Sequence, residues 1–163
     1  MPDPDSDTLI LDLKSGRVTI QLRPDIAPKH VERVKMLARE GFYDGTPFHR
    51  VIEGFMAQGG DPTGTGTSGS KHGNLPAEFS RTAKFLRGTV GAARTGDPNS
   101  ANSQFYIMFA PAPHLDGQYT IWGQVIEGME HVDQIKRGSG GSGSVSNPDC
   151  IVKATLAADT PAS

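Results

Sequence analysis

Residues 48–61 bring a cation, an amide and two large apolar side chains together in one short stretch, so we begin with them. The segment has the pattern of an apolar strand, a tight Glu-Gly turn and a second short strand. Because strand side chains alternate between faces, Arg50 shares a face with Met56 and Gln58 if the turn keeps the register, while Phe55 is out of phase. The pattern predicts a planar guanidinium, which can donate several hydrogen bonds, beside an apolar surface. The alternative is that Arg50 is a solvated strand residue and that Phe55 and Met56 are core residues.

A second predicted strand, over residues 103–109, carries a face of similar character. One side of this strand is wholly apolar and is predicted to be core: Phe105, Ile107 and Phe109. The opposite side mixes polar tips with apolar bodies: Gln104, Tyr106 and Met108. Two strands therefore offer the same kind of amphipathic surface.

Most other chemistries find little support in the sequence. The five histidines show no H-x-x-x-H pairing and no flanking cysteines, which argues against a zinc or iron site. A G-x-S-x-G nucleophile elbow is absent. Cys150 opens an apolar strand with no neighbouring base, so a buried structural thiol is predicted in place of a nucleophile. We expect no metal, no cofactor and no covalent intermediate.

Residues 64–69 read Gly-Thr-Gly-Thr-Ser-Gly and match the dinucleotide-binding pattern G-x-G-x-x-G. The residues that follow, Ser-Lys-His-Gly-Asn-Leu-Pro, cannot open a helix, and no βαβ unit surrounds them. The Gly-Lys-Ser/Thr ending of a P-loop is also missing. A surface loop is predicted here in place of a nucleotide site.

Composition limits the partners and the location of the chain. Its 163 residues suit one domain, and a net charge of −2 with scattered Lys and Arg suggests neither a nucleic-acid nor a membrane partner. The N-terminus lacks a signal-peptide pattern, and no apolar run approaches the roughly 18 residues of a membrane span. A cytoplasmic protein is expected. No long apolar stripe is left exposed, so a monomer is the default.

The arrangement of predicted elements favours a mainly β domain. Twenty glycines and twelve prolines separate short alternating segments. Apolar stripes at helical spacing predict helices over residues 28–40 and 129–137. The domain is expected to span residues 8–157, with a flexible leader at 1–7 and a flexible tail at 158–163.

Six short motifs lie along the chain: Phe-His-Arg-Val-Ile at 48–52, Gly-Phe-Met-Ala-Gln-Gly-Gly-Asp at 54–61, Ser-Gln-Phe-Tyr-Ile at 103–107, Leu-Asp-Gly at 115–117, Trp-Gly-Gln-Val at 122–125 and Glu-Gly-Met at 127–129. Together they resemble the motifs of the cyclophilins, which are peptidyl-prolyl cis-trans isomerases. The motifs fall in family order, the resemblance covers roughly residues 8–157, and residues 93–102 look like the single-domain bacterial branch. The resemblance implies a closed antiparallel barrel of eight strands, capped by two helices.

The resemblance also implies roles for individual residues. Arg50 matches the catalytic arginine of the family. The positions that match the proline pocket and the substrate groove are Phe55, Met56, Gln58, Ala93, Arg94, Thr95, Gln104, Tyr106, His114, Leu115 and Tyr119. No metal site is implied.

Three of these positions depart from the best-known eukaryotic cyclophilins. His114 stands in place of a tryptophan, Tyr119 in place of a histidine and Tyr106 in place of a phenylalanine. The arginine and the pocket floor are retained, so isomerase activity is still expected. Since the family's tryptophan contacts cyclosporin, binding of that ligand is expected to be weak.

The resemblance implies that the partners are proline-containing peptides and folding proteins. In the implied mechanism, Arg50 donates a hydrogen bond to the prolyl nitrogen of a twisted amide, while an apolar pocket holds the proline ring. Neither a proton nor an electron is transferred, which fits the absence of acid–base pairs. The alternative is a proline-peptide binding module that does not catalyse rotation.

Overall fold

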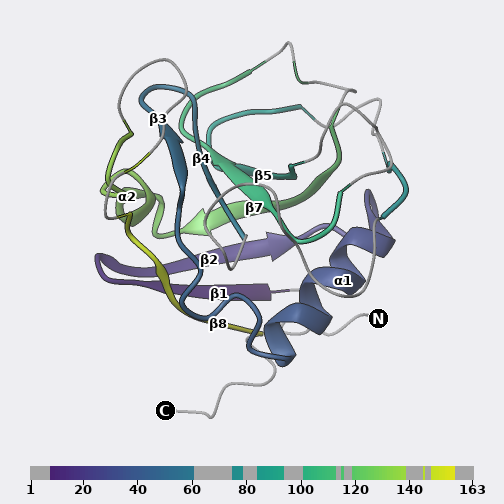
Figure 1. Ribbon diagram of the computed structural model, residues 1–163. Coiled ribbons are helices and arrows are strands. Elements are labelled where there is room, and N and C mark those ends of the chain that lie inside the picture. The colour runs from purple at the N-terminus through teal and green to yellow at the C-terminus, as the bar shows by residue number, and fades with distance from the viewer. Residues whose placement is uncertain are drawn as a thin grey trace.

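The computed structural model describes residues 8–60, 75–78, 84–93, 101–112, 115, 119–138, 145 and 148–156. These residues form eight strands and two helices (Figure 1). In chain order the elements are β1 (Thr8–Leu13), β2 (Gly16–Leu22), α1 (Pro28–Arg39), β3 (Arg50–Ile52), β4 (Met56–Gly59), β5 (Thr89–Ala92), β6 (Phe105–Met108), β7 (Ile121–Glu127), α2 (Met129–Val132) and β8 (Ile151–Leu156). The predicted mainly β class is confirmed.

All eight strands belong to one antiparallel, strongly curled sheet, in the order β3-β4-β6-β5-β7-β2-β1-β8. The predicted closed barrel is not confirmed, because the edge strands β3 and β8 form no ladder with each other. In the described part of the chain the two edges approach through the segments before them, where Pro47 and Cys150 form an isolated bridge. The bridge is closed by hydrogen bonds from the N–H of Phe48 to the carbonyl of Asp149 at 2.8 Å and from the N–H of Ile151 to the carbonyl of Thr46 at 2.9 Å, and it does not continue into β3.

Helix α1 begins at Pro28, where the missing N–H of proline leaves no bond unmade. Its N-cap residue supplies no side-chain hydrogen bond. Instead, the Glu78 carboxylate accepts hydrogen bonds from the backbone N–H groups of Lys29, at 3.2 Å, and His30, at 2.9 Å. An anion at this end also complements the helix dipole. A residue 48 positions along the chain therefore caps the helix.

The C-terminal end of α1 is closed by Gly41, directly after the predicted helical range of residues 28–40. Gly41 has φ of +72°, a left-handed conformation that favours glycine. The N–H of Phe42 bonds the carbonyl of Leu37 at 3.0 Å, and that of Gly41 bonds Ala38 at 3.2 Å. These are the two bonds of a Schellman motif, and they satisfy carbonyls that the helix end would leave unbonded.

Helix α2 is shorter than the predicted helix over residues 129–137. It is a single turn of four residues, so the predicted cap of two full helices is not confirmed. Val132 and Ile135 are nonetheless buried, at 0% and 3% exposure. The predicted apolar stripe is therefore buried, but after residue 132 the chain that carries it forms turns and a bend in place of a helix.

The core divides into two clusters on the two faces of the curled sheet. The larger cluster takes residues from all eight strands and both helices and therefore fills the inside of the curl. It includes Phe105 and Ile107 of β6, whereas Tyr106 and Met108 belong to the second cluster, together with Met56 of β4. The predicted alternation of β6 is thus confirmed, and the second cluster forms an apolar layer on the outer face.

Strand β8 does not alternate regularly between buried and exposed residues. The register between β1 and β8 shifts between Asp12 and Leu13, which pair with Lys153 and Ile151, so Val152 has no partner. Such a bulge changes the phase of the side chains. Val152 is therefore 61% exposed, and the prediction that Cys150 is buried is wrong, because its thiol is exposed.

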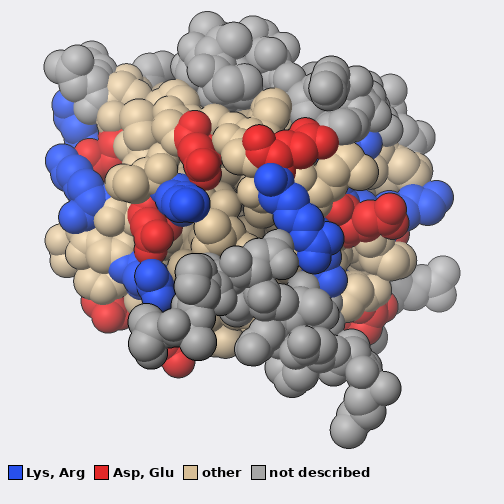
Figure 2. All heavy atoms as spheres, turned by 90° about the horizontal axis from the view of Figure 1, so that it is seen from below, with Lys and Arg blue, Asp and Glu red and all other residues tan. Residues whose placement is uncertain are grey.

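The surface of the molecule carries both signs of charge. Figure 2 shows Lys and Arg interspersed with Asp and Glu on the face that it presents. None of the described helices combines the length and the apolar character required to cross a bilayer.

Buried His30 links the stability of the fold to pH. Its Nδ1 lies 2.6 Å from Glu78 Oε1, and burial lowers the pKa of the imidazole although Glu78 opposes the shift. The unfolded chain then binds a proton at higher pH than the folded chain does. Stability contributed by neutral His30 is therefore complete above the unfolded pKa of about 6.5 and is lost as pH falls towards the folded pKa.

We predict that the free energy of unfolding decreases between pH 7 and pH 5 and that His30→Asn flattens this dependence. Asparagine can still donate a hydrogen bond to Glu78 but does not titrate. Urea unfolding at a series of pH values measures the slope. Equal slopes in the two proteins would show that His30 is not the group responsible.

Candidate active site

Strand register places the predicted functional residues in one row on the outer face of the sheet. Arg50 of β3 pairs with Gln58 of β4, and Gln58 pairs with Tyr106 of β6. Residues directly opposite on antiparallel strands share a face. The row therefore crosses three strands, and the turn between β3 and β4 keeps the register that the sequence predicts.

A chain of polar contacts runs along this row. Arg50 Nη1 donates a hydrogen bond to Gln58 Oε1 at 3.3 Å, and Gln58 Nε2 donates one to Gln104 Oε1 at 3.0 Å. The backbone carbonyl of Gln104 accepts a hydrogen bond from the N–H of Ala93 at 3.0 Å. Arg50 is exposed, and the two glutamines are partly buried. Gln58 therefore orients the guanidinium of Arg50, and the rest of the Arg50 side chain is exposed to solvent.

The row borders a pocket of about 350 Å³. Its lining residues are Arg50, Phe55, Met56, Gln58, Ala93, Tyr106, Leu115 and Tyr119. Met56, Tyr106 and Leu115 are at most 9% exposed and form an apolar floor. The arrangement offers a cationic donor at the edge of an apolar cavity, which is suited to binding a small apolar ring next to a polar group.

Phe55 reaches this pocket even though it is out of phase with Met56. It precedes β4, so strand alternation does not apply to it. The turn that holds it is closed by a 3.0 Å hydrogen bond from the N–H of Phe55 to the carbonyl of Ile52. Gly54 has φ of +74° in this turn, a conformation that glycine adopts without strain.

Two aromatic rings support Tyr106. Tyr119 meets it edge to face with ring centroids 5.8 Å apart, and Phe85 lies against it at 5.9 Å. Phe85 is 1% exposed, and the sequence does not predict this contact because Phe85 precedes β5 in a segment without clear periodicity. The close approach of Phe85 depends on Gly91, where an added Cβ would lie 2.7 Å from the ring.

Nine of the twelve predicted site residues are among the described residues, and all nine meet here. Eight of them line the pocket and Gln104 bonds to Gln58. The other three, Arg94, Thr95 and His114, lie outside the described residues. The shared location is observed, whereas the roles of these residues in catalysis and binding stay predictions.

Potential metal ligands do not cluster in the described part of the chain. Within it, no group of three or more His, Cys, Asp or Glu side chains could hold a metal ion. The glycine-rich segment 64–69 lies outside the described residues, so the prediction of a surface loop there is untested.

Comparison with known proteins agrees with this geometry. Residues 8–156 match the model of the family described as cyclophilin type peptidyl-prolyl cis-trans isomerase. The chain belongs to the cyclophilin family. Its predicted class of enzyme, peptidyl-prolyl cis-trans isomerase, is thereby confirmed, as is the resemblance drawn from its motifs.

Relatives from two bacteria carry the same description. A probable peptidyl-prolyl cis-trans isomerase of Brucella suis is 55% identical over 170 residues, which cover 97% of this chain and 86% of the relative. A peptidyl-prolyl cis-trans isomerase of Helicobacter pylori is 42% identical over 126 residues, 76% of each chain.

Solved structures of cyclophilins have the same fold. One from Hirschia baltica has a TM-score of 0.86 and 29% identity over 98% of this chain and 76% of that chain. Another, from Cryptosporidium parvum and crystallised in the presence of the dipeptide Ala-Pro, has a TM-score of 0.85 and 30% identity over 91% of this chain and 98% of that chain.

The close packing of Gly91 beneath Phe85 gives a prediction about the pocket floor. Gly91→Ala should destabilise the protein by about 1–3 kcal/mol, because the new methyl group overpacks the space between Phe85 and the carbonyl of Thr120. Urea unfolding measures the change. In a Phe85→Leu background the cost of Gly91→Ala should be smaller, because the ring that clashes has been removed. Equal costs in the two backgrounds would contradict this explanation.

Proposed function

We propose that this cyclophilin accelerates rotation about Xaa-Pro bonds of folding proteins and that Arg50 stabilises the twisted amide. The observation that carries the proposal is the guanidinium held by Gln58 at the edge of the apolar pocket. In this proposal the proline ring occupies the pocket and the bond to be rotated lies beside Arg50.

Amide resonance is the barrier that such an enzyme must lower. Rotation about a peptide bond costs about 18–20 kcal/mol, and uncatalysed exchange of an Xaa-Pro bond takes on the order of tens to hundreds of seconds. In the planar ground state the nitrogen lone pair is delocalised and accepts almost no hydrogen bond. Twisting localises the lone pair on nitrogen and makes it an acceptor. A donor placed at this atom therefore binds the transition state better than the ground state.

The contacts of Arg50 suit it to this role. Its bond to Gln58, itself bonded to Gln104, restricts the guanidinium before substrate arrives, so little reorganisation is needed during rotation. The apolar floor beneath it excludes water, which would otherwise compete as a hydrogen-bond donor to the nitrogen. In this proposal Gln58 and Gln104, which border the row, also hold the flanking peptide.

The Ala-Pro dipeptide named with the Cryptosporidium cyclophilin supports a proline-containing ligand for this pocket as well. We also propose that the protein acts as a monomer in the cytoplasm. Weak cyclosporin binding remains an expectation, because it rests on His114, outside the described residues.

We predict that Arg50→Ala lowers kcat/KM for an Xaa-Pro peptide by about 10²–10³-fold, the effect typical of removing one transition-state donor. Arg50→Lys should recover part of the rate, because it keeps the charge but loses the planar fork. A proline-exchange assay measures the rates. Arg23→Ala is the matched control, since it removes an exposed arginine that pairs with Asp25 and does not line the pocket.

The outcomes separate the two functions considered. A wild-type protein that binds the peptide but exchanges it no faster than buffer would be a binding module. Equal catalysis by wild type and Arg50→Ala would keep the enzyme but remove Arg50 from its mechanism.

A further inference from the structure

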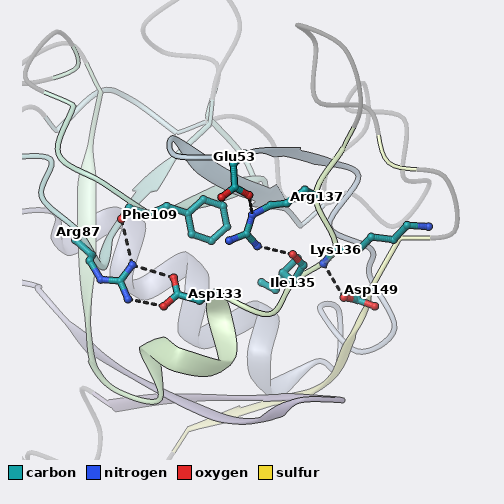
Figure 3. Close-up of polar contacts among 8 residues, drawn as sticks. All are labelled: Glu53, Arg87, Phe109, Asp133, Ile135, Lys136, Arg137 and Asp149. Atoms are coloured by element: carbon teal, nitrogen blue, oxygen red, sulfur yellow. Dashed lines mark hydrogen bonds and ion pairs between the residues drawn. The ribbon is translucent and has the colours of Figure 1, made fainter.

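Residues 133–138, which follow α2, lie against the hairpin that carries Arg50 and Phe55 (Figure 3). The N–H of Gly138 bonds the carbonyl of Val51 on β3 at 2.8 Å. The side chain of Arg137 pairs with Glu53 in the turn between β3 and β4. This segment therefore contacts both a strand and the turn of the hairpin.

Arg137 makes three contacts at once. Its Nε donates to Glu53 Oε2, its Nη1 donates to the carbonyl of Ile135, and its guanidinium carbon lies 4.1 Å from the centre of the Phe109 ring. The side chain is 26% exposed, although Glu53 is 75% exposed. A planar cation stacked on a ring and bonded along its edge is held in one orientation, which most surface arginines are not.

Phe109 connects Arg137 to the pocket. Its ring lies under Arg137, while its N–H bonds the carbonyl of Phe55 at 2.8 Å. Phe55 thus lies between two fixed points, the Glu53 turn before it and the Phe109 backbone bonded to it. Both points are held by the same guanidinium.

A second arginine fixes the other side of Phe109. Arg87 donates to the Phe109 carbonyl at 3.2 Å and forms a two-pronged ion pair with Asp133. Arg87 is the main cause of the lowered pKa of the Asp133 carboxyl, and the charge of Arg137 adds to it. The start of the 133–138 segment is therefore joined to Phe109 through Arg87, and Arg137 near its end contacts Phe109 directly.

We propose that Arg137 and Glu53 are positioning residues that fix Phe55 on the wall of the proline pocket. The proposal rests on the proposed function for its effect on substrate. Neither side chain lines the pocket, so they act through the turn and through Phe109. We call the Arg137–Glu53 pair, with its contact to Phe109, the clamp. Its loss loosens the pocket wall that holds the proline ring but leaves Arg50 bonded to Gln58.

The expected kinetic signature is a change in KM with kcat retained. Arg137→Ala raises KM about five- to tenfold, the loss expected when a partly desolvated cation–π contact no longer orders the wall. Its kcat stays within about twofold, because the catalytic donor is untouched. Simple destabilisation would do the reverse, since a smaller folded fraction lowers kcat and leaves KM unchanged.

The variants are Arg137→Ala, Arg137→Lys, Glu53→Gln and the double change Arg137→Ala/Glu53→Gln. Arg137→Lys keeps the charge and lies between wild type and Arg137→Ala. The double variant has a KM close to that of Arg137→Ala, because the two residues act as one unit. Arg17→Ala is the control: it breaks a similar Arg–Asp pair on the β1–β2 hairpin, which contributes nothing to the pocket lining.

Amide hydrogen exchange tests the clamp independently of turnover. In Arg137→Ala the N–H groups of Phe55 and Phe109 exchange faster, while that of Phe42, bonded to Leu37 at the end of α1, does not change. Unchanged exchange at Phe55 and Phe109, an unchanged KM, or fully additive effects would overturn the proposal. Faster exchange at these amides in a protein whose wild type is inactive would overturn the proposed function and leave the clamp standing.

Discussion

Register between β3, β4 and β6 is the constraint on which the active site depends. Arg50, Gln58 and Tyr106 meet because each lies directly opposite the next, on the outer face of the sheet. A slip of one residue in any of these strands would turn its side chains to the other face and remove that residue from the row. The hydrogen bond from Arg50 to Gln58 therefore follows from strand pairing.

The two faces of the sheet carry separate apolar clusters, one that forms the main core and one beneath the pocket. The inner face is filled by a cluster to which every strand and both helices contribute, whereas the outer cluster around Tyr106 supports the pocket. Because the reaction transfers no proton, electron or group, the outer face needs no acid–base pair. In the proposed mechanism it needs a hydrogen-bond donor beside the prolyl nitrogen and an apolar wall that does not move. In our proposal, the contacts of Arg137 with Glu53 and Phe109 order that wall.

Features that repeat locally could be predicted from the sequence, and features that depend on distant contacts could not. Alternation in β6, the shared face of Arg50 and Gln58, and the ends of α1 at Pro28 and Gly41 all follow from short-range rules. The bulge at Val152, the length of α2 and the open edge of the sheet depend on how strands meet in space. The contacts of Phe85 and Arg137 could not be predicted for the same reason, since the partner of each lies more than twenty residues away.

Exchange spectroscopy by NMR on a peptide that saturates the protein tests the role of Arg50 most directly. It measures the rate of cis–trans rotation on the protein separately from the binding of either isomer. Differential binding predicts that Arg50→Ala slows rotation in the bound state by about 10²-fold or more while the dissociation constants of the cis and trans forms change only a few-fold. Unchanged rotation in the bound state, with weaker binding of both isomers, would contradict it and would make Arg50 a substrate-binding residue.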